Sequence, residues 1–167
     1  MEDYRLCEQG GLVELRSAAD CRDTALAMAQ LAANSLMIIS RDLEPPLYDT
    51  PEFEQAAFSL ARRSHRNIVH VLVQDVSLAV KQGHRLVNLA QRLSSRVEIR
   101  RPPKEFADYN SAFLIADECG YLRRPLADRF EGAADFNDRP STRELAKLFR
   151  DIWSRSHTDP QLRRLQI

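Results

Sequence analysis

The stretch that decides the fold reads Tyr109-Asn110-Ser111-Ala112-Phe113-Leu114-Ile115-Ala116-Asp117. Its centre is a continuous apolar run of strand length, which is typical of a strand covered on both faces. The next residues, Asp117-Glu118-Cys119-Gly120, have the composition of a turn, and Tyr121-Leu122-Arg123 can return antiparallel. The segment therefore predicts a buried strand that ends in a tight turn.

Two earlier apolar runs predict further buried strands, at residues 36–39 and 68–73. Each is preceded by a helix with a clear starting signal. Ser17-Ala18-Ala19-Asp20 forms a capping box for a helix that runs to about Ala33, and Thr50-Pro51 supplies a cap and a first-turn proline for the next. Strand and helix patterns thus alternate along the first half of the chain.

The alternation continues towards the C-terminus. A helical period extends from beyond Asp75 to about Leu93, with an interruption at Gly83, and residues 96–100 alternate like a more exposed strand. Ser141-Thr142-Arg143-Glu144 reads as a second capping box, and the helix after it carries apolar residues on a single face.

This order of elements predicts an α/β fold with a mixed β-sheet flanked by helices. A chain of 167 residues with 44% hydrophobic content is long enough for one core, so we expect a single domain over 1–167. Its core spans about 17–156, and a short basic tail at 157–167 contains Arg163 and Arg164.

Composition limits the partners and the location. Lys plus Arg equals Asp plus Glu at 24 each, so no net field attracts nucleic acid or anionic lipid. The first residues, Met1-Glu2-Asp3-Tyr4-Arg5, lack the pattern of a signal peptide, and no apolar run approaches the roughly 20 residues that span a bilayer. We expect no transmembrane segment and a cytoplasmic protein.

The three cysteines, Cys7, Cys21 and Cys119, are odd in number and form no CxxC pair. This pattern favours reduced thiols over a disulfide framework or a zinc site. We therefore predict no metal site.

Several enzyme classes lack their motifs. The five glycines cannot assemble a phosphate-binding P-loop or a dinucleotide GxGxxG motif, and the GxSxG and HExxH motifs are absent. None of the histidines, His65, His70, His84 and His157, is followed two positions later by lysine. The sequence predicts no cofactor.

From Leu36 to about Ser156 the chain resembles one half of a phospholipase D-like fold. The resemblance rests on the repeated strand–helix units, on Phe113-Leu114-Ile115-Ala116-Asp117 with its following turn and strand, and on the late helix that bears Phe149 and Trp153. Members of this family carry His-x-Lys-x4-Asp, and single-motif members pair as two-fold dimers.

The resemblance implies a site from which the chemistry has been removed. If Asp117 is the family's aspartate, Asn110 stands at the nucleophilic histidine and Ala112 at the lysine. An amide nitrogen is neither a nucleophile nor a general acid or base near neutral pH, and alanine has no charge for a phosphate. The family's downstream Gly-Ser and Asn fall near Arg124, Pro125 and Ala127. We expect no phospholipase D-type catalysis and therefore no catalytic residues, which favours a chain that is not an enzyme.

Polar residues at the strand ends remain candidates for binding, because ligands favour the carboxyl ends of strands in such sheets. The candidate ligand-binding cleft comprises Arg41, Asp42, Asp75, Tyr109, Asn110 and Asp117. Arg41 can grip an anion in a bidentate manner. A structural interpretation stays open, in which Asp42, Asp75 and Asp117 cap turns or helices and Arg41 pairs with one of them.

Two further patterns have structural interpretations. His70 shares a strand face with Ile68 and Leu72, which favours a core histidine over a base. A basic stripe forms only if the strands that carry it are adjacent, and aromatic interleaving for nucleic acid is sparse, so we expect no nucleic-acid partner. The stripe would comprise Arg96, Arg100, Arg101, Lys104, Arg123 and Arg124.

Three functions follow. The first is a catalytically inactive phospholipase D-like module that self-associates as a homodimer and binds a protein partner or an anionic small ligand. The second is a phosphodiester hydrolase that uses other residues in the same cleft, with His70 or His84 as the displaced histidine. The third is an accessory protein of an acetyltransferase-related system, since the chain also resembles segments of bacterial acetyltransferase-related proteins.

Overall fold

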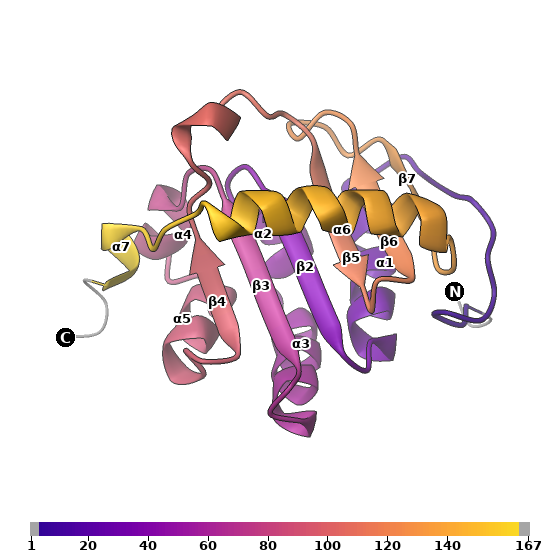
Figure 1. Cartoon of the computed structure of the whole chain (residues 1–167), viewed down its shortest axis with the longest axis horizontal. Helices are drawn as coiled ribbons and strands as arrows, with labels where there is room; N and C mark the ends of the chain where they lie inside the picture. Colours follow the sequence, from indigo (N-terminus) through magenta and orange to yellow (C-terminus); the bar gives the residue numbers. More distant parts are fainter. Residues whose placement is uncertain (1–3, 164–167) are drawn as a thin grey trace.

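The computed structural model describes residues 4–163, which form one sheet of seven strands in the order β1-β7-β6-β5-β2-β3-β4 (Figure 1). Strands β2, β3 and β4 are parallel to one another, and every other neighbouring pair is antiparallel. The strands are β1 (Val13–Leu15), β2 (Ser35–Ser40), β3 (Ile68–Val73), β4 (Val97–Arg100), β5 (Ala112–Ala116), β6 (Gly120–Arg124) and β7 (Gly132–Asp135). The predicted α/β fold with a mixed sheet is confirmed.

Helices cover the two faces of the sheet unequally (Figure 1). Helices α1, α3 and α5 pack on one face, and the long α6 crosses the other. The helices are α1 (Ala18–Leu31), α2 (Pro45–Tyr48), α3 (Pro51–Arg63), α4 (Ser77–Lys81), α5 (Arg85–Arg92), the short 3-10 helix η1 (Lys104–Phe106), α6 (Arg139–Ser154) and α7 (Pro160–Arg163).

Each face of the sheet has its own hydrophobic core, because successive side chains of a strand point to opposite faces. Leu36 and Ile38 of β2 pack with the helices α1, α3 and α5. Met37 and Ile39 pack under α6, against side chains that include Phe149. Burying such an aliphatic side chain contributes about 1.5–3 kcal/mol, so β2 is anchored from both sides.

The helix starts follow the predicted signals in two of three cases. Ser17 Oγ accepts the backbone N–H of Asp20, and Thr50 Oγ1 accepts that of Phe53, both at 3.1 Å. The third helix, α6, begins earlier than predicted, because Asp138 is its cap and accepts the N–H of Ser141. Ser141 is therefore a donor in the first turn rather than the cap.

The two ends of the chain depart most from the prediction. The edge strand β1 and its neighbour β7 were not predicted, because they are short and β7 is rich in small residues. The predicted basic tail includes the short helix α7, which was not predicted, and Arg164 lies outside the described residues. Within residues 4–163, every helix is too short or too polar to cross a membrane.

The prediction of three reduced thiols is wrong for two of them. Cys7 and Cys119 form a disulfide across 112 residues of sequence, and Cys21 is the buried free cysteine. The fold creates this pair, because the N-terminal segment runs beside β7, where the Cys7 N–H donates to the Phe136 carbonyl at 3.0 Å. Disulfides are rare in a reducing cytoplasm, so this bond weakens the sequence argument for a cytoplasmic location.

Protein purified without reductant is expected to titrate one thiol per chain after denaturation, and three after reduction, because Cys21 alone is unpaired. Cys7→Ser is expected to lower the free energy of unfolding by about 2–4 kcal/mol, since the bond closes a long loop. Denaturant titration measures this loss. The matched control is the same pair of proteins in excess dithiothreitol, where the difference should vanish. A difference that persists there, or three thiols before reduction, would contradict the assigned bond.

Candidate anion-binding site

The parallel strands bring polar residues from separate segments to one edge of the sheet. Because β2, β3 and β4 point the same way, the residues after their carboxyl ends converge. They line a hollow of about 490 Å³, which we call the β2–β4 hollow. Its polar lining consists of Arg41 and Asp42 after β2, Gln74 and Asp75 after β3, Arg101 after β4, and Lys104 and His157.

Backbone hydrogen bonds hold the floor of the hollow. The N–H groups of Gln74 and Asp75 donate to the carbonyls of Ser40 and Arg41, at 3.1 and 2.8 Å, and so continue the β2–β3 pairing past the strand ends. The Gln74 side-chain amide donates to the Phe106 carbonyl at 2.8 Å, which ties η1 to the same edge. The hollow is therefore framed by ordered backbone.

Cations outnumber carboxylates among the lining residues of the hollow. Hydrogen bonds from Ser77 hold the pKa of Asp75 below its usual value, and the charges of Arg101 and Arg41 lower it further. Arg101 lies 3.9 Å from the buried carboxylate of Asp159, a long contact. Arg41 and Lys104 have no ion pair within the described part of the chain, so two of the three cations remain available for an anion.

Half of the residues predicted to form the cleft line the β2–β4 hollow. Arg41, Asp42 and Asp75 line it together. Tyr109 lines a different groove between α6 and the β6–β7 side of the sheet, and burial raises the pKa of its hydroxyl. Asn110 is exposed and joins neither, although its carbonyl accepts the Ala127 N–H at 2.7 Å.

Asp117 does not belong to a cleft with the other candidates, and its inclusion is corrected. Because β5 runs antiparallel to β2, Ala116 pairs with Leu36, and Asp117 lies at the opposite edge of the sheet from Arg41. Its carboxylate accepts three backbone N–H groups, from Ala33, Asn34 and Ser35, at 2.8, 2.7 and 2.9 Å. The structural interpretation of Asp117 as a turn residue is the one that applies.

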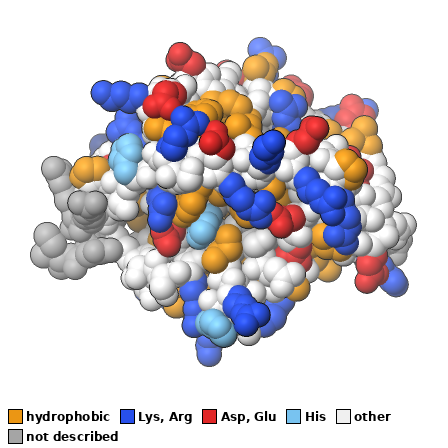
Figure 2. Space-filling model, in the orientation of Figure 1, with side chains coloured by type: hydrophobic (Ala, Val, Ile, Leu, Met, Phe, Trp, Pro, Cys, Tyr) orange, Lys and Arg blue, Asp and Glu red, His pale blue; other side chains and the backbone are white. Residues whose placement is uncertain are grey.

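The predicted basic stripe does not form, because β5, β2 and β3 separate β4 from β6. Figure 2 shows Lys and Arg side chains intermixed with Asp and Glu over the face that α6 crosses. Of the stripe residues, Arg100 pairs with Glu98 at 2.9 Å and Arg124 is buried. Only Arg101 and Lys104 meet, and they do so in the β2–β4 hollow.

Sequence comparison assigns the family. Residues 17–165 match the family model described as "Domain of unknown function (DUF7931)". The chain belongs to the DUF7931 family. No curated protein matches its sequence.

Solved structures show that the DUF7931 fold is phospholipase D-like. The chain resembles Nuc, a phospholipase D family member from Salmonella typhimurium, with a TM-score of 0.61 and 13% identity, over 89% of this chain and 97% of Nuc. NucT from Helicobacter pylori gives a TM-score of 0.64 and 11% identity, over 90% and 99%. The archaeal chromatin protein TrmBL2, described as showing a novel mode of DNA binding, gives 0.66 and 15% over 95% of this chain, which spans 57% of TrmBL2.

In this DUF7931 chain an ion pair lies beside the positions that the resemblance assigns to the catalytic histidine and lysine. Ala112 is buried and pairs in register with Arg124 of β6. Arg124 is 1% exposed and lies 2.7 Å from a carboxylate oxygen of Glu44, which is also buried. The position that the resemblance assigns to the catalytic lysine therefore lies next to a buried ion pair.

The partners of this pair satisfy most of its polar atoms. Arg124 donates to the carbonyls of Ala127 and Arg129, at 2.9 and 2.8 Å, and Ser40 Oγ donates to Glu44 Oε1 at 3.1 Å. Burial raises the pKa of Glu44, and Arg124 and Ser40 oppose that rise. Burial tends to lower the pKa of Arg124, but the charge and hydrogen bond of Glu44, together with Tyr48 and Cys21, raise it overall, so the guanidinium stays charged.

Neither Glu44 nor the interior role of Arg124 is predicted from the sequence. One signal was available, because alternation along β6 places Arg124 on the same face as the buried Leu122. Glu44 had no such signal, since it lies in a loop before Pro45. Of the other hollow residues, His157 comes from the segment after α6, and only the fold brings it to β4 through the bridge between His157 and Arg101.

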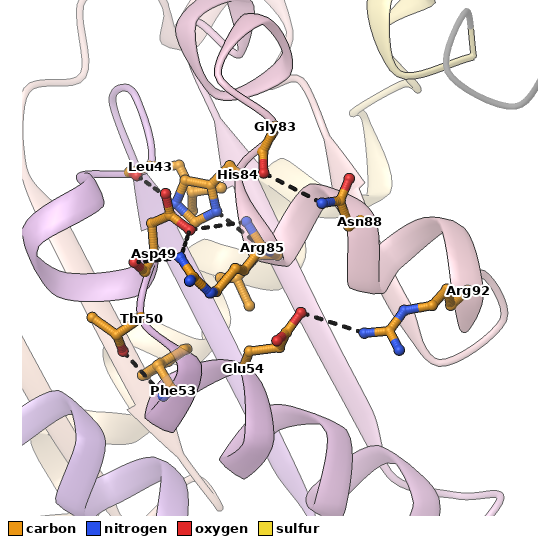
Figure 3. Close-up of polar contacts among 11 residues, drawn as sticks. Leu43, Asp49, Thr50, Phe53, Glu54, Gly83, His84, Arg85, Asn88 and Arg92 are labelled. Atoms are coloured by element: carbon orange, nitrogen blue, oxygen red, sulfur yellow. Dashed lines mark hydrogen bonds and ion pairs between the residues drawn. The ribbon is translucent and has the colours of Figure 1, made fainter.

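The two histidines considered as displaced catalysts lie elsewhere. His84 is buried, and its ring nitrogens contact the Leu43 carbonyl and the Leu86 N–H, both at 3.1 Å (Figure 3). His70 lies on the α6 face with its ring stacked on Trp153 at 4.1 Å. Burial lowers the pKa of both imidazoles. Both are held in packing positions and neither lines the β2–β4 hollow.

Arg124→Met is expected to lower the free energy of unfolding at pH 7 by about 3–5 kcal/mol, because Glu44 stays buried without its cation. Removing Arg124 removes the main influence that opposes burial, so the pKa of Glu44 rises further. The folded variant then takes up a proton more readily than the unfolded one, and its stability deficit should shrink between pH 7 and pH 5. Urea titration at both pH values measures this.

The control is the double substitution Glu44→Leu/Arg124→Met, which removes both charges from the interior. Its stability should lie close to that of the unaltered protein and should not improve on acidification. If the single and double variants lose the same stability at pH 7, the pair does not carry the charge balance that we assign to it.

Proposed function

We propose that this chain is a phospholipase D-like module without the family's catalysis, and that it binds an anionic small ligand in the β2–β4 hollow. The observation that carries the proposal is the gathering of Arg41, Arg101 and Lys104 around one hollow at the carboxyl ends of three parallel strands. Two of these cations have no ion-pair partner among residues 4–163. Arginine and lysine on an ordered frame are the usual ligands of phosphate and carboxylate groups.

The case against catalysis rests on chemistry at two positions. Asn110 offers no nucleophile, and Ala112 offers no charge. The neighbouring cation, Arg124, is committed to Glu44 and to two carbonyls in the interior. A phosphodiester beside Asn110 and Ala112 would meet neither a nucleophile at those two positions nor an available cation from β5 or the buried end of β6.

A hydrolase that uses other residues needs a histidine in the cleft, and His157 is the only described histidine that lines the hollow. It lies beside Arg101 through a backbone bridge. This alternative has a test of its own, because it requires turnover that depends on His157.

Inorganic phosphate is the probe for the proposed site. At matched ionic strength, phosphate is expected to raise the melting temperature above that in chloride, because a ligand of the folded state stabilises it. Arg41→Gln and Lys104→Gln should each weaken phosphate binding by about tenfold, as expected for a lost charge-assisted hydrogen bond. Calorimetric titration measures the affinities.

Arg139→Gln is the matched control, since Arg139 is an exposed arginine on α6 that does not line the hollow. It should bind phosphate as the unaltered protein does. Equal weakening in all three variants would indicate general charge screening and would contradict a site. Release of nitrophenolate from bis(p-nitrophenyl) phosphate that stops in His157→Gln would replace the binding module by the hydrolase.

We further propose that the chain self-associates as a homodimer through the edge that carries Asn110, as single-motif members of the resembled family do. An isologous contact buries the same surface patch of both copies, so one substitution acts twice. Light scattering during size-exclusion chromatography should give twice 19.1 kDa at micromolar concentration. Asn110→Arg should shift the mass towards the monomer, because two like charges then approach the axis.

Gln30→Arg is the control for this shift, since Gln30 is exposed on α1, away from the proposed contact. A strict monomer of the unaltered chain would remove the dimer and leave the ligand site untouched. The accessory role beside an acetyltransferase-related enzyme rests on sequence resemblance alone. TrmBL2 is described as binding DNA, and we keep the sequence-based expectation that this chain has no nucleic-acid partner, because its charges are intermixed.

A further inference from the structure

We propose that the ligand of the β2–β4 hollow is a phosphate monoester whose carbon skeleton carries neighbouring hydroxyl groups, such as a sugar phosphate. This inference rests on the proposed anion binding and adds the chemistry of the rest of the ligand. Its basis is the pairing, in one hollow, of available cations with carboxylates and an amide that can accept hydrogen bonds.

The cations account for the phosphate end. Arg41 and Lys104 have no ion pair within the described residues, and Arg101 has only the 3.9 Å contact to Asp159. A phosphate monoester carries close to two negative charges at neutral pH, as a phosphorylated side chain does, and offers several acceptor oxygens. Three cations, two of which can present flat guanidinium groups, match such a group.

A ligand that carries only an anionic group does not explain the two carboxylates that line the hollow. Asp42 is exposed and makes no hydrogen bond or ion pair among residues 4–163, although it lines the same hollow as the three cations. Asp75 is ionised, since its pKa is held below its usual value, and it gives one oxygen to the Ser77 N–H at 3.0 Å. Beside a simple anion these charges would only repel it.

Hydroxyl groups on the ligand account for the two carboxylates in an anion site better than a cationic group does. An ionised carboxylate can only accept hydrogen bonds, so its natural partners are O–H and N–H groups. An ammonium group would gain from Asp42 and Asp75 but would also be repelled by the three cations, which line the same hollow. Neutral hydroxyls hydrogen-bond to both carboxylates without that repulsion, and the Gln74 side chain adds a further polar partner.

The size and apolar lining of the hollow fit a small polyol. Its volume of about 490 Å³ lies within the range of roughly 300–1,000 Å³ that is typical of small-molecule sites. Its apolar lining is made of Leu78, Pro102, Pro103 and Ala107, which suits a short carbon skeleton. The His157 imidazole is the one flat aromatic ring among the described lining residues, so a nucleobase would gain little from stacking.

The experiment compares ribose 5-phosphate with inorganic phosphate by calorimetric titration of the full chain at matched ionic strength. Ribose 5-phosphate should bind about tenfold more tightly, from two further hydrogen bonds to charged acceptors. Asp42→Ala should invert the trend: affinity for inorganic phosphate rises, because a repelling charge is lost, while affinity for ribose 5-phosphate falls. Simple charge removal would strengthen the binding of both.

Three controls separate the possible failures. 2-Deoxyribose 5-phosphate lacks one hydroxyl of the neighbouring pair and should lie between the two probes. Adenosine 5′-monophosphate should bind no more tightly than ribose 5-phosphate, and a clear gain would replace the sugar phosphate by a nucleotide. Equal affinity for phosphate and ribose 5-phosphate, or an unchanged preference in Asp42→Ala, would overturn this inference alone. No binding of either would overturn the proposed function as well.

Discussion

The buried ion pair between Glu44 and Arg124 is the contact on which the arrangement of the segments after β2 and β6 depends. It joins the loop after β2 to the loop after β6, and each partner also holds its own loop. Arg124 donates to two carbonyls of the segment that follows β6, while Glu44 accepts from Ser40 at the end of β2. Taking two charges out of water costs several kcal/mol, so such a pair persists only when its hydrogen bonds are nearly complete. One carboxylate oxygen of Glu44 is buried without a hydrogen-bond partner among residues 4–163, so the loss of a further contact of this carboxylate would be costly.

This pair also bears on the position that the resemblance assigns to the catalytic lysine. Side chains of Ala112, Arg124 and Ser40 share the sheet face that packs against α1 and α3, at the edge where β2, β5 and β6 end or begin. A lysine at position 112 would bring a second cation next to Arg124 with only Glu44 to balance both. The small side chain of Ala112 is therefore consistent with the interior pair, and the two features belong to one arrangement. The opposite edge is fixed independently, by the three hydrogen bonds to Asp117 and by the disulfide that ends at Cys119.

The sequence was sufficient for features that depend on local pattern. The apolar runs located β2, β3 and β5, and the caps at Ser17 and Thr50 marked two helices, because period and capping chemistry act within a few residues. Features that depend on strand direction were harder. Nothing local shows that β5 runs antiparallel to β2, and this single fact moves Asp117 away from Arg41. The pairing of Cys7 with Cys119 and the approach of His157 to the hollow are contacts between distant segments, which no spacing rule anticipates.

The junction between β2 and β5 divides the end of the sheet that carries the β2–β4 hollow into two halves with different electrostatics. On the antiparallel side the charges are turned inward and neutralise each other, as Arg124 and Glu44 do. On the parallel side, the charged residues that follow β2, β3 and β4 lie at the surface. Arg41 and Lys104 have no ion-pair partner there among the residues described. The anion site that we propose therefore lies at the ends of the parallel strands rather than at the position that the resemblance assigns to the catalytic motif. Backbone hydrogen bonds between the segments after β2 and β3 hold the proposed site in place, so its geometry does not depend on which side chains stand at positions 110 and 112.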